Sequence, residues 1–243
     1  MKKALAFFWL ILIPVDTARA GFSVALEAGP IWQTRNDVRV PPASGTAFSI
    51  SDAASGPFLR GRVYVGYEFA ERHEFRLLFA PLTITAQTTF DQVVNFAGTA
   101  FAAGTATEAS YKFNSYRLTY RYKFYQGEDW QFKIGFTAKI RDADITLTQG
   151  ATTASSKNVG FVPLLNFAFR YQMADAWYLL FDLDGLAAPQ GRAFDGTLQA
   201  GWQMSPDFDL NFGYRTVEGG AENSTVSTFA WVHYAVLGIT GRF

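Results

Sequence analysis

The chain has 243 residues, and its 21 Lys and Arg side chains are balanced by 21 Asp and Glu. It therefore lacks the excess positive charge on which nucleic-acid binding depends. The absence of cysteine excludes disulfides, thiolate metal sites, a cysteine nucleophile and a lipid-modified cysteine.

The one long apolar run lies at the start of the chain. Two lysines precede the apolar segment 4–15, and the tripeptide Ala-Arg-Ala at 18–20 offers a small-x-small cleavage site. This pattern is typical of a secretory signal peptide and is too short for a membrane helix of about 20 apolar residues. We expect residues 1–20 to be a cleaved signal peptide, with an uncleaved anchor as the alternative, and residues 21–243 to be one exported domain.

From residue 22 onward, apolar and polar residues alternate in segment after segment, and no apolar stripe with helical spacing appears. Trp130, Phe132 and Ile134, for example, alternate with Gln131 and Lys133. A period of two predicts strands with one apolar and one polar face. The predicted strands are ten: 22–28, 59–69, 75–79, 116–124, 130–138, 165–171, 177–183, 194–202, 208–214 and 229–243.

The connections between these segments alternate in length. Short polar turns are predicted near 71–73, 126–129, 173–175 and 205–207. Longer segments, rich in Ala, Thr, Ser, Gly and Asn, are predicted as loops near 33–57, 87–109, 146–158, 185–193 and 216–228. Short turns at one end and long loops at the other are typical of a transmembrane barrel.

The sequence thus predicts an all-β fold, a transmembrane antiparallel up-and-down β-barrel with short periplasmic turns and long extracellular loops. About ten strands are expected, and eight are the alternative if 75–85 or 22–32 pairs differently. A soluble β-sandwich with aromatic rings in its core is a further alternative.

Aromatic residues gather at the ends of the predicted strands. Amphipathic rings prefer the level of the lipid headgroups, so two girdles are expected, one at each edge of the membrane. The predicted girdle residues are Trp130, Trp177, Trp202, Trp231 and Phe243.

The last segment, 235–243, has alternating apolar residues and ends in Phe243. In this ending, and in its architecture over residues 21–243, the chain resembles the bacterial outer-membrane β-barrel proteins, without matching a narrower family. The resemblance implies a location in the bacterial outer membrane, in contact with the lipid bilayer and lipopolysaccharide. It also implies the barrel-assembly machinery and periplasmic chaperones as partners during biogenesis, and no nucleic-acid partner is expected.

The face opposite the apolar one carries charges of both signs. Either these charges pair and fill the lumen, or an excess of basic residues lines a narrow water-filled pore that favours anions. The predicted lumen-facing charged network consists of Arg60, Arg62, Arg76, Arg117, Arg121, Lys133, Lys139, Arg170, Asp182, Asp184, Asp195 and Arg215.

Few residues support catalysis. His73 falls in a predicted turn, and His233 lies on the lipid-facing parity, where a girdle role is expected. His233 is followed by Tyr-Ala-Val, without the His-x-Ser-Asn motif of an outer-membrane lipid A deacylase. Ten strands resemble the omptin proteases, but the Asp-x-Asp pairs at 142–144 and 182–184 have no accompanying Asp-x-His.

We therefore expect no catalytic residue, no metal and no cofactor. The leading hypothesis is a non-enzymatic integral outer-membrane barrel with a structural or surface-interaction role and a charge-filled lumen. A narrow pore for small solutes, with a preference for anions, is the alternative, and a rim-sited surface hydrolase is the third hypothesis.

Overall fold

The computed structural model describes residues 21–189 and 191–243, so the predicted signal peptide at 1–20 lies outside the described residues. No helix in the described part of the chain is long and apolar enough to cross a membrane. The elements are β1 (Gly21–Arg39), β2 (Phe48–Ser49), α1 (Ile50–Ala53), β3 (Phe58–Phe69), β4 (His73–Ala80), β5 (Thr83–Thr89), β6 (Val94–Phe96), β7 (Thr99–Phe101), β8 (Ala106–Gln126), β9 (Trp130–Gln149), β10 (Thr152–Ala174), β11 (Trp177–Ala188), β12 (Gly191–Gln203), β13 (Phe208–Glu222) and β14 (Ser227–Arg242).

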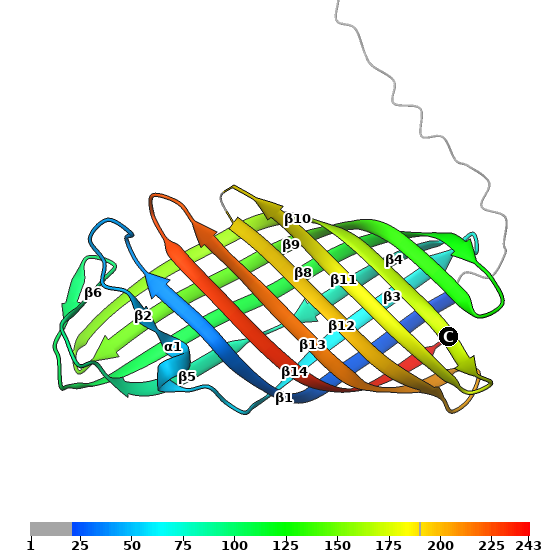
Figure 1. Ribbon diagram of the computed structural model, residues 1–243, viewed down its shortest axis with the longest axis horizontal. Coiled ribbons are helices and arrows are strands. Elements are labelled where there is room, and N and C mark those ends of the chain that lie inside the picture. Colours follow the sequence, from blue (N-terminus) through cyan, green and yellow to red (C-terminus); the bar gives the residue numbers. More distant parts are fainter. Residues whose placement is uncertain (1–20, 190) are drawn as a thin grey trace, which may run out of the picture.

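Antiparallel strands close into a barrel (Figure 1). The hydrogen-bonded order runs β1, β3, β4, β8 and then β9 to β14 in sequence, and β14 pairs with β1 to close the ring. Ten of the 12 strands of this sheet form the ring, while β2 and β5 pair with the distal parts of β1 and β8. The prediction of a ten-stranded antiparallel barrel is confirmed, and the eight-stranded alternative is wrong.

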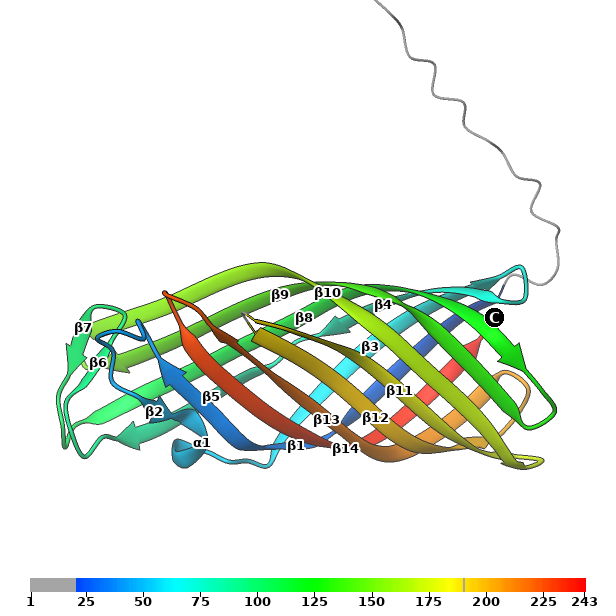
Figure 2. The ribbon, with the colours of Figure 1, turned by 45° about the horizontal axis from the view of Figure 1, so that its top comes forward.

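Both ends of the described barrel domain lie at the rim that carries the short turns (Figure 2). Phe22 and Phe243 exchange backbone hydrogen bonds, with N–H to O distances of 3.1 and 2.8 Å. We refer to this end as the turn end and to the opposite one as the loop end.

The third strand of the ring is interrupted between β4 and β5. Pro81 has no N–H to contribute to a ladder, so regular pairing stops there. The N–H of Leu82 donates instead to Asn114 Oδ1 at 3.1 Å, and the N–H of Phe113 donates to Leu82 O at 2.7 Å. Pairing with β8 then resumes at Thr83 in β5.

The loop lengths predicted from the sequence need correction. Three segments predicted as long loops, 146–158, 185–193 and 216–228, are mostly strand. There β9 ends at Gln149 and β10 begins at Thr152, β11 ends at Ala188 and β12 begins at Gly191, and β13 ends at Glu222 and β14 begins at Ser227. Polar segments, such as the Thr-rich 146–158, form strands readily when a neighbouring strand accepts their backbone hydrogen bonds. The other two predicted loops, 33–57 and 87–109, contain the irregular chain together with β2, α1, β6 and β7.

The barrel is much taller on one side than on the other. Strands β8, β9 and β10 have 21, 20 and 23 residues, whereas β11 and β12 have 12 and 13. A tilted strand needs about 9–11 residues to cross a bilayer. The three long strands therefore continue beyond the rim as a wall, to the left in Figure 1.

The outer face of the barrel carries an apolar belt. Leu59, Phe136, Phe161 and Leu237 lie on four different strands and are 64–74% exposed. A soluble monomer rarely exposes contiguous apolar surface on this scale, so the belt is suited to contact with lipid.

Aromatic residues border this belt. At the turn end Trp130 stacks on Tyr171 with ring centroids 4.3 Å apart, and Trp177 stacks on Trp202 at 6.0 Å. Phe243 at the same end is 78% exposed. Trp231, which is 40% exposed, lies toward the loop end and donates its Nε1–H to Thr216 Oγ1 at 2.7 Å.

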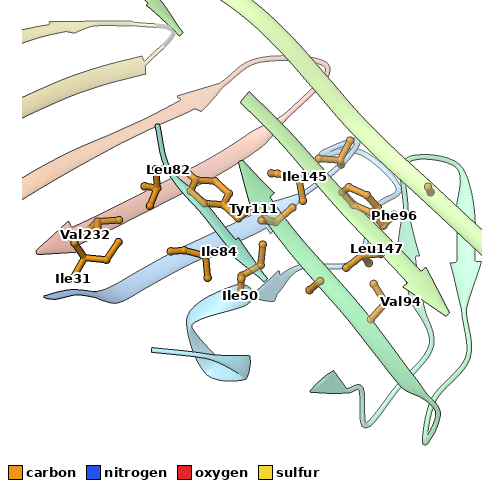
Figure 3. Packing of buried hydrophobic residues seen from close by; sticks show 14 of the residues in the cluster. Ile31, Ile50, Leu82, Ile84, Val94, Phe96, Tyr111, Ile145, Leu147 and Val232 are labelled. Atoms are coloured by element: carbon orange, nitrogen blue, oxygen red, sulfur yellow. The ribbon is translucent and has the colours of Figure 1, made fainter. Parts of the chain in front are cut away.

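Inside the loop end, the barrel is filled with buried apolar side chains, which we call the apolar plug (Figure 3). They come from the barrel wall, from α1 and from the β6–β7 hairpin, which forms a separate two-stranded sheet. The plug consists of Ile31, Val38, Val40, Ile50, Leu82, Ile84, Val94, Phe96, Phe101, Ala109, Tyr111, Ile145, Leu147, Ala154, Val232, Tyr234 and Val236.

The plug should anchor the hairpin. Because Phe96 is completely buried, Phe96→Ala is expected to cost about 3–5 kcal/mol of packing and to release the β6–β7 hairpin. Limited proteolysis should then cleave within 90–105 while the heat-modifiable gel mobility of the barrel stays unchanged. Val93→Ala is the matched control because Val93 is 52% exposed. Equal protease resistance of Phe96→Ala and the wild type would contradict the anchoring role.

Candidate functional site in the barrel lumen

The first centre of charge in the lumen is Asp195 on β12. Its side chain is buried and accepts hydrogen bonds from Arg62 at 2.8 Å, from Arg117 at 2.6 Å and from Arg215 at 2.6 Å. These arginines lie on β3, β8 and β13. Since β3 and β8 are remote from β12 in the strand order, the ion pairs cross the lumen.

The second centre is a pair of carboxylates on β11. Asp182 accepts from Arg76 and from Arg121, both at 2.6 Å. Asp184 accepts from Arg117 Nη1 at 2.8 Å, and the other Nη of the same guanidinium binds Asp195. Arg117 therefore links the two centres into one network that joins β4 and β8 to β11 and β12.

Neutral polar residues complete the network, and sequence reasoning did not include them. Asn166 Nδ2 donates to Asp182 at 2.9 Å and to Asp184 at 2.8 Å, and Thr137 Oγ1 donates to Asp184 at 2.7 Å. Both share the inward parity of the charged residues on their strands, so the same pattern could have identified them.

Two other predicted members lie nearer the turn end, and Lys133 is joined to the network through Glu74, which lies 3.7 Å from Arg121. Lys133 Nζ lies 2.7 Å from Glu74 and also reaches Glu68. The guanidinium of Arg170 lies 3.6 Å from the ring centroid of Tyr178, whose hydroxyl donates to Asp209 at 2.7 Å. A cation over an aromatic face is stabilised without a carboxylate partner.

Arg60 and Lys139 make no ion pair among the residues that the structure describes. Arg60 is partly exposed and donates to backbone carbonyls, including that of Thr83 at the start of β5. Lys139 is buried, and its Nζ lies 4.8 Å from the ring centroid of Phe113. Phe113 packs on the apolar plug, so Lys139 marks the boundary between the charged layer and the plug.

The two Asp-x-Asp pairs lie on opposite faces of the barrel wall. Asp142 is on the outer face of β9 and binds Lys112 at 2.8 Å, a hydrogen bond that lowers the pKa of the carboxyl. Asp182 and Asp184 lie inside and are bound by arginine. The two pairs therefore do not form one site, and within 21–189 and 191–243 no group of three or more His, Cys, Asp or Glu is placed to hold a metal ion.

A cavity of ≈ 140 Å³ remains in the lumen beside the network. Its charged lining residues are Glu27, Arg76, Asp182 and Arg215, and Gln199 is among the neutral ones. The Nε atoms of Arg76 and Arg215 have no hydrogen-bond partner among the described protein atoms. A polar cavity of this size has room for ordered water, which can satisfy such donors.

Comparison with known proteins identifies the fold class alone. No protein-family model and no curated protein matches the chain. Among solved structures, the outer membrane protease OmpT of Escherichia coli has a TM-score of 0.53 and 10% identity, and the match covers 92% of this chain and 97% of that one.

Two further matches have lower similarity. The attachment invasion locus protein Ail of Yersinia pestis matches with a TM-score of 0.44 and 10% identity, over 91% of this chain and 99% of Ail. The toluene transporter TodX of Pseudomonas putida matches with a TM-score of 0.36 and 9% identity, over 92% and 90% of the two chains. The chain thus has the fold of a bacterial outer-membrane β-barrel, in agreement with the location predicted from the sequence.

Proposed function

We propose that the protein is an outer-membrane barrel with a closed lumen, which acts through its outer surface and its loop end. The observation that carries this proposal is that two closed layers of side chains lie one above the other inside the barrel. A charged layer crosses the middle of the lumen, and the apolar plug fills the loop end above it.

The charged layer is too strongly connected to serve as a simple pore lining. A single arginine, Arg117, holds carboxylates on two strands, and Asp195 holds three arginines. Breaking a buried pair leaves a charge without compensation, at a typical cost of about 3–5 kcal/mol. An ion that passed this layer would have to separate such pairs.

The plug adds a second barrier. Its side chains include Phe96, Phe101 and Leu147, each with no exposed surface. An apolar constriction excludes water, and therefore ions, even where no side chain blocks the path completely. The charged layer blocks ions by its ion pairs and the plug blocks them by excluding water, so the loss of one barrier leaves the other in place.

The outer surface supports a location in a lipid bilayer. The apolar belt encircles the barrel, and Trp177 and Trp202 at one edge and Trp231 at the other lie where headgroups would meet it. The wall formed by β8, β9 and β10 would then project outward, with lipopolysaccharide as its neighbour. Its polar outer face and structured tip suit surface interaction.

A narrow anion-preferring pore is the second candidate. Two features favour it: Lys139, which is buried and has no carboxylate partner in the part of the chain that the structure describes, and the ≈ 140 Å³ cavity. It requires that the charged layer and the plug open together, and conductance separates the two candidates.

Asp195 should be the most costly single charge to remove. Asp195→Asn leaves Arg62, Arg117 and Arg215 without their shared carboxylate, so the free energy of unfolding should fall by about 3–5 kcal/mol. Urea unfolding of the refolded protein in detergent measures this loss. Asp37→Asn is the matched control, since the Arg35–Asp37 pair is exposed and is expected to contribute at most about 1 kcal/mol. Equal losses for the two variants would count against the bracing role of Asp195.

Planar-bilayer recording tests the closed lumen directly. The wild-type protein should give no stable single-channel steps, with heat-modifiable mobility and vesicle flotation confirming insertion. Reproducible steps would overturn the closed-lumen proposal. If those steps are anion-selective, Arg117→Gln together with Arg121→Gln should shift their selectivity, as the pore hypothesis requires.

A further inference from the structure

A hydroxyl, an imidazole and a phenol meet on the outer face of the barrel, outside the lumen network. His233 Nε2 lies 2.8 Å from Thr34 Oγ1, and His233 Nδ1 is hydrogen-bonded to the hydroxyl of Tyr214. Thr34 and His233 are separated by 199 positions in the sequence and lie on β1 and β14. The closure of the barrel brings them together.

A β-bulge presents Thr34. Trp32 pairs with His233 and Gln33 with Val232, but the next residue to pair is Arg35, with Trp231. Thr34 is the extra residue and is exposed. Bulges redirect side chains in this way and are over-represented beside active sites.

Aromatic rings fix the orientation of the imidazole. His233 is only 8% exposed and stacks on Trp32 with centroids 5.6 Å apart. The ring of Trp231 lies at 5.3 Å and that of Tyr214 at 5.9 Å. A base that is held by packing and by a third polar group meets the geometric requirement for activating a nucleophile.

We propose that Thr34, His233 and Tyr214 form a hydrolytic site for acyl esters of membrane lipids. The tautomer that donates its Nδ1–H to the Tyr214 oxygen leaves Nε2 free to accept the proton of Thr34. Thr34 Oγ1 attacks the ester carbonyl, and its proton passes to Nε2 and then to the departing alcohol. Water, deprotonated by His233, next attacks the acyl-threonine ester, releases the fatty acid and restores the hydroxyl.

The surroundings of the site select an amphiphilic substrate. Toward the turn end lies the apolar belt, which suits an acyl chain. Toward the loop end lies a depression of ≈ 720 Å³ whose lining includes Arg35, Arg192 and Phe229. The two guanidinium groups lie 4.5 and 4.9 Å from the Phe229 ring centroid and are each about half exposed. Each is already ion-paired, Arg35 with Asp37 and Arg192 with Glu218, so an anionic headgroup would share these guanidinium groups with the carboxylates.

The second histidine provides a matched control within the same chain. His73 also binds a tyrosine through Nδ1, Tyr120 at 2.8 Å, and stacks on Phe69 at 5.2 Å. Among the hydrogen bonds of the described residues, no hydroxyl is bound to its Nε2. His73→Gln should therefore leave acyl release unchanged.

The protein is inserted into vesicles of anionic phospholipid and, in a parallel arm, into vesicles that contain lipopolysaccharide. The experiment measures the fatty acid that is released from these lipids. Thr34→Val and His233→Gln should each lower release by roughly 100-fold or more. Thr34→Ser should retain it. A fluorophosphonate probe should add one mass label to the wild type and none to Thr34→Val. The arm that shows release identifies the lipid class.

No release and no label in wild-type protein would overturn the proposal, as would full release by Thr34→Val. The inference rests on the proposed position of the belt in the bilayer. Vesicle flotation of each variant separates a failure to insert from a failure of the chemistry, and the conductance result on the same preparation is independent of both.

Discussion

The rest of this structure depends on one constraint: inward- and outward-facing side chains alternate along the strands of a closed barrel. Every second side chain of ten strands must point into a lumen of limited width, and the inward residues of the middle segments are charged. Burial of so many charges is tolerable because most of them are compensated by a partner of opposite sign. Lys139 and Arg170 instead lie over the rings of Phe113 and Tyr178. Asp195 binds three arginines, and each of these has a second carboxylate partner, Asp184 for Arg117 and Glu27 for Arg62 and Arg215.

Toward the loop end, the polar and apolar faces of the same strands change places, so that the apolar face lies inside. On β9 the inward residues change from Thr137 and Lys139 to Ile145 and Leu147, while the outer face becomes acidic at Asp142. Beyond this point a water-exposed wall carries its own apolar core on its inner side. The plug is therefore a continuation of the barrel interior. The proposed closed lumen follows from one alternation of side chains, in which the inward residues are charged in the middle of the barrel and apolar toward the loop end.

This reversal explains which parts of the fold sequence analysis could predict. The ten strands and their outward aromatic residues were predictable because the apolar residues of each predicted strand face outward. In 142–148 the alternation continues, but Ile145 and Leu147 face inward beside polar outer residues, and the loop prediction for 146–158 misses the end of this strand. The pairing of Arg117 with two carboxylates, and the meeting of Thr34 with His233, depend on curvature and on a bulge that parity does not encode.

The reversal also locates the edge of the apolar belt, and this edge passes through the outer-face histidine. On β13 the outer residues run from Tyr214 through Thr216 to Glu218, and Thr216 pairs with His233. A carboxylate is costly in hydrocarbon, so the apolar region must end between Tyr214 and Glu218. In the proposed membrane position, an imidazole at that level would meet water from one side and acyl chains from the other. The proposed chemistry at His233 would thereby be restricted to molecules that themselves have both a polar and an apolar part.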